Sequence, residues 1–276
     1  EYMQAYMDEH GYASMDDIPK AEMEAFWADL KSRQNTDWMR KLLRPARFTI
    51  HDVSVSSGTD RTKIFFSLQD YREEGISYGS DFTRRGGRLN VSHEFTDWFD
   101  AGANVMISNR KESLLRDIYN VQNPFVAVYT YNPYEPVYNA DGSYNLTHQG
   151  FSIAEAIARN PERANTVNSV NTFYGQLKLF RNLKFRTELG TEYTDYTREY
   201  FIQPGSILDF YTGNPDKPGN KSDNGFYRFN YRWSNTLNYN KTFGGGHALG
   251  ALVGTEYTQE EYKSYVVRSI GYPNNN

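Results

Sequence analysis

Apolar and polar residues alternate with a period of two from Arg47 to the end of the chain, with interruptions. The stretch YRFNYRWSNTLNYN shows the pattern most clearly. Its large apolar residues share one parity: Tyr227, Phe229, Tyr231, Trp233, Leu237 and Tyr239. Arg228 and Arg232 lie on the other parity, together with asparagine, serine and threonine. Because successive side chains of a strand point to opposite faces, this stretch predicts one long strand with an aromatic face and a polar face.

The predicted strands come in pairs that are joined by short turns. The pairs are 47–57 with 62–71, 84–95 with 99–108, 167–180 with 184–196, and 227–243 with 247–262. Turns of this length favour tight hairpins. Between one pair and the next, the connections 72–83, 109–166 and 197–224 are long. This strict alternation is typical of an outer-membrane barrel, which has short turns on one rim and long extracellular loops on the other.

We therefore expect an all-β fold, in which residues 45–276 form about eight strands of an antiparallel transmembrane β-barrel segment. Residues 1–44 lack the period of two and are expected to form helix and loop on the extracellular side. Pro19 stands where a first helical turn tolerates proline. The residues at i, i+3, i+4 and i+7 spacing that follow it are Met23, Phe26, Trp27 and Leu30. This spacing predicts an amphipathic helix with one packing face.

The longest connection contains a cluster of tyrosines among three prolines. Four of them are candidates for contacting a bound sugar or peptide: Tyr129, Tyr131, Tyr134 and Tyr138. The alternative is that these rings pack against one another and order the loop, since clustered aromatic residues dominate packing. In the same connection YNADGSY predicts a small hairpin that turns at Gly142, because a calcium loop needs further carboxylates at fixed spacing. FSIAEAIARNPE predicts a short helix that Pro161 ends.

Composition narrows the class of protein. The chain has 276 residues, and its 30 Lys and Arg against 34 Asp and Glu leave a net charge of −4, which argues against nucleic-acid binding. No run reaches the ~18–20 apolar residues that a membrane-spanning helix needs, whereas barrel strands need only about ten residues each. There is no cysteine, and the acidic first residues do not resemble a signal peptide.

No arrangement for enzyme chemistry is evident in the sequence. The five histidines are scattered without a metal-ligand spacing, and no phosphate-binding loop or nucleophile elbow occurs. We therefore expect no catalytic residues, no bound metal and no cofactor. Glu188 and Glu192 share a strand face with Lys184 and Arg186, which indicates a solvated polar face.

Residues 35–108 resemble the early barrel of the SusC/RagA family of TonB-dependent outer-membrane transporters. Six short elements occur in the family's order: NTDW at 35–38, SVSSG at 54–58, EGI at 74–76, GSDF at 79–82, RLN at 88–90 and DW at 97–98. The ordered run is specific, although each element alone is weak. One departure is Ser57, where the family often has glycine. From Tyr119 onward the likeness lies in architecture and style of loop.

The resemblance implies a 22-stranded barrel in the outer membrane of a Gram-negative bacterium. Such a barrel encloses an N-terminal plug, is energised through the TonB complex and imports oligosaccharides or peptides with a SusD-like surface lipoprotein as lid. This sequence shows no plug, no TonB box and no terminal aromatic strand. Because lumen diameter grows with strand number, about eight strands cannot close such a barrel. We expect an internal piece of a larger transporter.

On this interpretation the aromatic parity faces outer-membrane lipid and the polar parity faces the lumen or the plug. The predicted lumen-facing residues are Arg228, Arg232, Glu188 and Glu192. Tyr227 and Tyr239 are candidates for the two aromatic girdles at the membrane interfaces. Two alternatives remain open at this point. One is a complete eight-stranded barrel with a structural or adhesive role, and the other is a soluble carbohydrate-binding β-sandwich.

Overall fold

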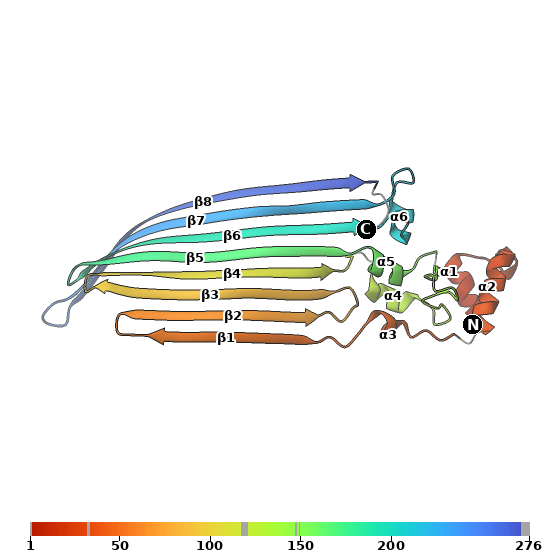
Figure 1. The fold of residues 1–276 in the computed structure, drawn as a ribbon, viewed down its shortest axis with the longest axis horizontal. Coiled ribbons are helices and arrows are strands. Elements are labelled where there is room, and N and C mark those ends of the chain that lie inside the picture. The colour runs from red at the N-terminus through yellow and green to blue at the C-terminus, as the bar shows by residue number, and fades with distance from the viewer. Residues whose placement is uncertain (1, 32–33, 117–120, 147, 149, 272–276) are drawn as a thin grey trace.

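The structure is a computed structural model that describes residues 2–31, 34–116, 121–146, 148 and 150–271 (Figure 1). Its main element is one antiparallel sheet of eight strands in the order β1 to β8. The strands are β1 Phe48–Gly58, β2 Thr62–Glu74, β3 Asp81–Thr96, β4 Phe99–Leu114, β5 Glu162–Phe180, β6 Leu183–Ile202, β7 Asn220–Thr242 and β8 Ala248–Ile270. Each strand pairs with the next along the chain, which confirms the predicted hairpin order.

The strands are longer than the sequence pattern indicated. The three connections between hairpins are therefore 75–80, 115–161 and 203–219, shorter than the expected 72–83, 109–166 and 197–224. Backbone pairing continues through the polar residues that had been assigned to loops, as in Arg72 opposite Thr83 and Arg110 opposite Thr166. Ladder hydrogen bonds need no apolar side chain, so hydrophobic periodicity ends before the strand does.

The register separates the sheet into two chemically different faces. One row across seven strands is entirely apolar or aromatic: Ile64, Val91, Ala103, Phe173, Leu189, Trp233 and Tyr257. The adjacent row on the opposite face is mostly polar: Phe65, Asn90, Asn104, Thr172, Gly190, Arg232 and Thr258. The alternation seen in one strand thus extends across the sheet.

The helices lie at one end of the sheet, beyond the strand ends (Figure 1). They are α1 Tyr2–His10, η1 Met15–Asp17, α2 Lys20–Lys31, α3 Trp38–Leu42, α4 Pro124–Thr130, α5 Ile153–Arg159 and α6 Ile207–Thr212. The predicted helices appear as α2 and α5, and the predicted turn appears at Gly142, whose φ is +84°. Sequence periodicity did not predict the short helices α4 and α6, each of which starts at a side-chain cap, Asn123 and Ser206.

Among the described residues the sheet does not close, because β1 and β8 are edge strands that do not pair with each other. This arrangement contradicts the alternative of a complete eight-stranded barrel. It also contradicts the soluble sandwich, since a sandwich needs two packed sheets and the named strands of the described chain form one. None of the described helices is long and apolar enough to cross a membrane. The C-terminal residues 272–276 lie outside the described residues.

Candidate functional site

The long connections and the N-terminal segment gather at one end of the sheet, opposite the short turns (Figure 1). We call this region the cap and define it as the described residues of 2–44, 75–80, 115–161 and 203–219. The cap contains two apolar clusters. The first centres on residues from α3 to α6: Trp38, Leu42, Ala127, Tyr131, Phe151, Ile153, Ala156, Ile207 and Leu208, with Ile202 of β6. The second joins α1 and α2 through Tyr6, Met7, Ile18, Phe26 and Tyr134.

The N-terminal segment is docked on the connection 115–161. The Thr36 N–H donates to the Pro133 carbonyl at 2.7 Å, and Trp38 Nε1 donates to the Asn132 carbonyl at 2.9 Å. The Phe26 ring meets the Tyr134 ring edge-on, with centroids 5.7 Å apart. Two segments about a hundred residues apart in the chain therefore form one folded unit.

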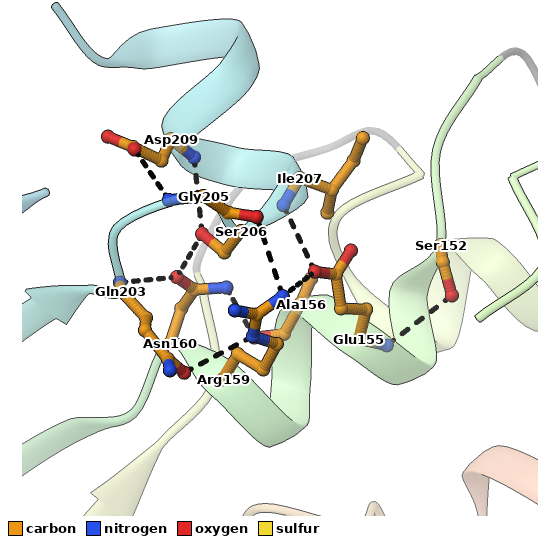
Figure 2. A network of polar contacts seen from close by, with 10 residues as sticks. All are labelled: Ser152, Glu155, Ala156, Arg159, Asn160, Gln203, Gly205, Ser206, Ile207 and Asp209. Atoms are coloured by element: carbon orange, nitrogen blue, oxygen red, sulfur yellow. Dashed lines mark hydrogen bonds and ion pairs between the residues drawn. The ribbon is translucent and has the colours of Figure 1, made fainter. Parts of the chain in front are cut away.

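A buried polar network connects α5 with α6 (Figure 2). Asn160, which caps the C-terminus of α5, accepts hydrogen bonds at Oδ1 from the Gln203 N–H at 3.1 Å and from the Ser206 hydroxyl at 2.9 Å. Its own Nδ2 donates to the Ala156 carbonyl at 3.1 Å. Ser206 in turn accepts from the Asp209 N–H at the start of α6. One side chain thus holds the end of one helix against the start of the next.

The second half of the network is ionic (Figure 2). Glu155 Oε1 accepts from the Arg159 guanidinium at 2.8 Å and from the Ile207 N–H at 3.3 Å. Arg159 also donates to the side chain of Gln203 at 3.2 Å. Because buried polar groups are costly unless they are hydrogen-bonded, this pairing permits polar side chains to be buried between α5 and α6 beside the first apolar cluster.

The structure divides the four predicted substrate-contacting tyrosines into two kinds. Tyr131 and Tyr134 are buried, with 7 % and 5 % of their surface exposed. The Tyr131 hydroxyl accepts a hydrogen bond from the Ile153 N–H at 3.0 Å. Burial raises the pKa of both hydroxyls, and for Tyr131 that hydrogen bond opposes the rise. These two rings pack inside the cap, which is the arrangement that the packing alternative expects.

Tyr129 and Tyr138 are accessible. Tyr129 is 86 % exposed at the end of α4, and Tyr138 is 54 % exposed. Tyr138 lies beside Tyr144 across the small hairpin, with ring centroids 5.2 Å apart. Exposed tyrosines offer apolar area and a hydroxyl to a ligand, so the substrate-contact hypothesis now rests on these two residues.

The cap also contains a buried group of one histidine and two carboxylates. His148 Nδ1 lies 3.1 Å from Glu135 Oε2 and 2.7 Å from Glu9 Oε1. Asn132 orients both acids, since its N–H donates to Glu135 Oε2 at 2.7 Å and its Nδ2 donates to Glu9 Oε2 at 2.5 Å. Burial lowers the pKa of His148, but the hydrogen bond to Glu135 and the nearby Glu9 carboxylate outweigh burial and raise that pKa to about 9.

Sequence reasoning missed this group because its members come from α1 and from two places in the connection 115–161. Ligand spacing in a sequence reveals a site only when the ligands share one element or one turn. The tyrosine cluster is the nearest sequence feature to this group. In the structure the Tyr131 ring stacks on His148, with ring centroids 3.8 Å apart.

The predicted lumen-facing residues share one face of the sheet. Glu192 is opposite Asn230, which lies between Arg228 and Arg232 on β7, and Glu188 is opposite Ser234. The same parity of β6 ends in Tyr200 and Ile202, which pack against the first apolar cluster of the cap. The cap therefore covers the polar face at its end of the sheet. Whether this face lines a lumen stays a prediction.

Comparison with known proteins gives consistent matches. No protein-family model matches the chain. TonB-dependent receptor P3 of Formosa agariphila is 24% identical over 267 residues, covering 87% of this chain and 25% of the relative. TonB-dependent receptor P26 of the same organism is 24% identical over 251 residues, covering 89% of this chain and 24% of the relative. The chain spans about a quarter of the length of the curated relatives it matches.

Among solved structures, a chain of the RagAB peptide importer in its closed-closed state has a similar fold. The TM-score is 0.72 at 20% identity, and the match covers 86% of this chain and 27% of that chain. These comparisons confirm the resemblance to SusC/RagA-type TonB-dependent receptors. They also confirm that the sheet has the fold of one part of a larger barrel.

Proposed function

We propose that this homologue of TonB-dependent receptors forms part of the wall and part of the extracellular cap of an outer-membrane transporter in a Gram-negative bacterium. The observation that carries the proposal is that the sheet has two chemically different faces and that its long connections gather at one end. One sheet has an apolar row and a polar row on opposite faces, and every long connection joins one cap at the same end (Figure 1). A barrel wall needs the first property, and selective uptake needs the second.

The dimensions of β7 support this interpretation. Tyr227 and Tyr239 are twelve residues apart on one parity of a 23-residue strand, which corresponds to about 40 Å along the strand. With the ~35–45° tilt of barrel strands, this length spans about 30 Å across the membrane, close to the hydrocarbon thickness. The two tyrosines are then at the two interfaces, and the aromatic residues between them face lipid.

The substrate class we propose is a bulky oligosaccharide or peptide, held at the cap by the exposed rings of Tyr129 and Tyr138. A SusD-like surface lipoprotein would cover the cap, and the TonB complex would act through a plug elsewhere in the full-length protein. The residues of this chain take part in binding and passage, and none carries out covalent catalysis.

Uptake by whole cells tests the proposal. The full-length protein is deleted and then restored, and uptake of labelled peptide and oligosaccharide pools is measured with and without a protonophore. We expect uptake of one pool to depend on both the protein and the proton gradient. Co-purification of a surface lipoprotein in stoichiometric amount tests the lid. Unchanged uptake of every pool after deletion would show that the transport proposal is wrong.

The double variant Tyr129→Ala, Tyr138→Ala tests the role of the cap. We expect weaker binding and slower uptake with unchanged amounts of protein in the membrane. The matched control is Phe243→Ala, which removes an exposed aromatic ring at the opposite end of the sheet, in the turn after β7. Equal uptake by the double variant and the control would show that the two tyrosines do not contribute to substrate binding.

A further inference from the structure

Glu9, Glu135 and His148 have the composition of a small metal site. Each residue offers one ligand atom, and the three atoms lie within 4.8 Å of one another. Imidazole nitrogen and carboxylate oxygen are together the donors that Zn²⁺ and related first-row divalent ions accept, with three protein ligands and one further position. His148 and Glu135 are almost completely buried, so these donors are held away from bulk water.

A single proton on His148 Nδ1 does not satisfy both carboxylates. The hydrogen bond of His148 Nδ1 goes to Glu135 Oε2. Glu9 Oε1 approaches the same nitrogen to 2.7 Å, yet this buried oxygen makes no hydrogen bond within the described part of the chain. Two carboxylates and one imidazolium also leave a net negative charge in a buried place, which is costly. A divalent cation with neutral imidazole balances both carboxylates.

Two of the three ligand separations need little change to accept an ion, and the third is within 4.8 Å. Ligand atoms at about 2.0–2.2 Å from Zn²⁺ in a tetrahedral arrangement are about 3.3–3.5 Å from one another. The two measured separations from Nδ1 are 2.7 and 3.1 Å, so each would lengthen by less than about 1 Å. The surrounding contacts are those that orient ligands in metal sites: Asn132 donates to both carboxylates, and the Tyr131 ring stacks on the imidazole.

A cavity lies beside the group. It has a volume of about 300 Å³ and is lined by Glu135 and Tyr134 together with Glu22, Asp29 and His10. Carboxylates on the walls of a cavity raise the local concentration of cations. One of the three ligands therefore borders a cavity that favours cations.

We infer that Glu9, Glu135 and His148 bind one divalent first-row metal ion, with Zn²⁺ the best match, and that the ion clamps α1 onto the connection 115–161. Binding through Nδ1 requires the neutral imidazole, so a proton leaves His148 when the metal enters. The inference concerns the construction of the cap and does not depend on transport.

The direct test uses the purified full-length protein in detergent, with Zn²⁺ alone as the probe. After equilibrium dialysis we expect one bound Zn²⁺ at this site. In crystals soaked with Zn²⁺, an anomalous peak is expected about 2.0–2.2 Å from His148 Nδ1. Absence of that peak, or a wild-type protein that retains no Zn²⁺, would overturn the inference.

Two histidine variants make the test specific. His148→Gln is expected to weaken Zn²⁺ binding by about tenfold or more, whereas the control His247→Gln, in the exposed turn between β7 and β8, is expected to leave it unchanged. Zn²⁺ should also slow proteolysis of residues 11–44 in the wild type but not in His148→Gln. Equal Zn²⁺ affinity in both variants would overturn the assignment. If His148→Gln does not fold, Glu135→Gln and the anomalous map decide.

Discussion

The sheet and the cap hold their residues in different ways. The buried apolar residues of the described chain lie in the cap or at the strand ends beneath it, whereas the middle of the sheet leaves residues such as Phe173, Leu189 and Trp233 accessible on its apolar face. The sheet is joined by backbone ladders from β1 to β8. The cap is joined by side chains, through two apolar clusters and the network around Asn160.

This difference indicates what each region requires from its surroundings. If the sheet is part of a barrel wall, as we propose, its apolar face contacts lipid and its two edge strands pair with further strands. The cap contains its own apolar clusters and its own hydrogen-bonded network around Asn160. Substitutions in the cap should therefore change stability by changing packing. Substitutions in the sheet should change stability according to whether that face contacts lipid or water.

The largest effect is expected in the core of the cap. Leu208 is fully buried at the start of α6, and Leu208→Ala should destabilise the cap by about 2–5 kcal/mol because it removes packed methyl groups and leaves a cavity. Hydrogen exchange of cap peptides in the full-length protein measures this loss. The control Met39→Ala, at an exposed position of α3, should change stability by less than about 0.5 kcal/mol.

A neighbouring pair on β5 tests the two faces of the sheet. Phe173→Arg places a charge in the apolar row and should cost about 2–4 kcal/mol if that row lies at the bilayer midplane. Thr172→Arg places the same charge one residue away on the polar face and should cost little. Urea unfolding of the full-length protein in lipid vesicles compares them. Equal costs would mean that the two faces do not meet different media.

The polar network of the cap should have an intermediate effect. Asn160→Ala removes the acceptor of the Gln203 N–H and the Ser206 hydroxyl, and leaving buried donors unsatisfied costs about 1–3 kcal/mol. Hydrogen exchange should then accelerate in α5 and α6 while β5 to β7 remain protected. Asn35→Ala, at an exposed position of the N-terminal segment, is the control. Faster exchange throughout the sheet would show that the cap and the sheet unfold together.

The smallest effect on stability is expected at Tyr129. Because its side chain is largely exposed, Tyr129→Ala should change the free energy of unfolding by less than about 0.5 kcal/mol. Tyr131→Phe should cost more, although it removes a single oxygen, because the buried Ile153 N–H loses its acceptor. Thermal unfolding of the two variants side by side measures the difference. A larger loss of stability from Tyr129→Ala than from Tyr131→Phe would contradict the assignment of Tyr129 as exposed and Tyr131 as buried.

The boundary between the sheet and the cap also largely separates the features that could be predicted from the sequence from those that could not. Alternation along β7 was sufficient to predict the strand and its two faces, and the short turns were sufficient to predict the hairpin order. The spacing of Met23, Phe26, Trp27 and Leu30 also predicted α2. Phe26 is buried as expected, whereas Trp27 is 39 % exposed and departs from the predicted packing face. By contrast, Tyr129 and Tyr131 are equivalent in the sequence, and only packing shows that one is exposed and the other buried.

Elements that follow a local rule could be predicted from the sequence alone. Period two sets a strand, a short polar turn sets a hairpin, and Pro161 ends α5, because each depends on residues close together in the chain. Three features became visible only in the folded chain: where the strands end, which loops pack together, and the contact of Glu9 with Glu135 and His148. Those outcomes depend on contacts between separate segments of the chain, which for Glu9 and Asn132 are 123 residues apart. Periodicity along the chain carries no information about such contacts.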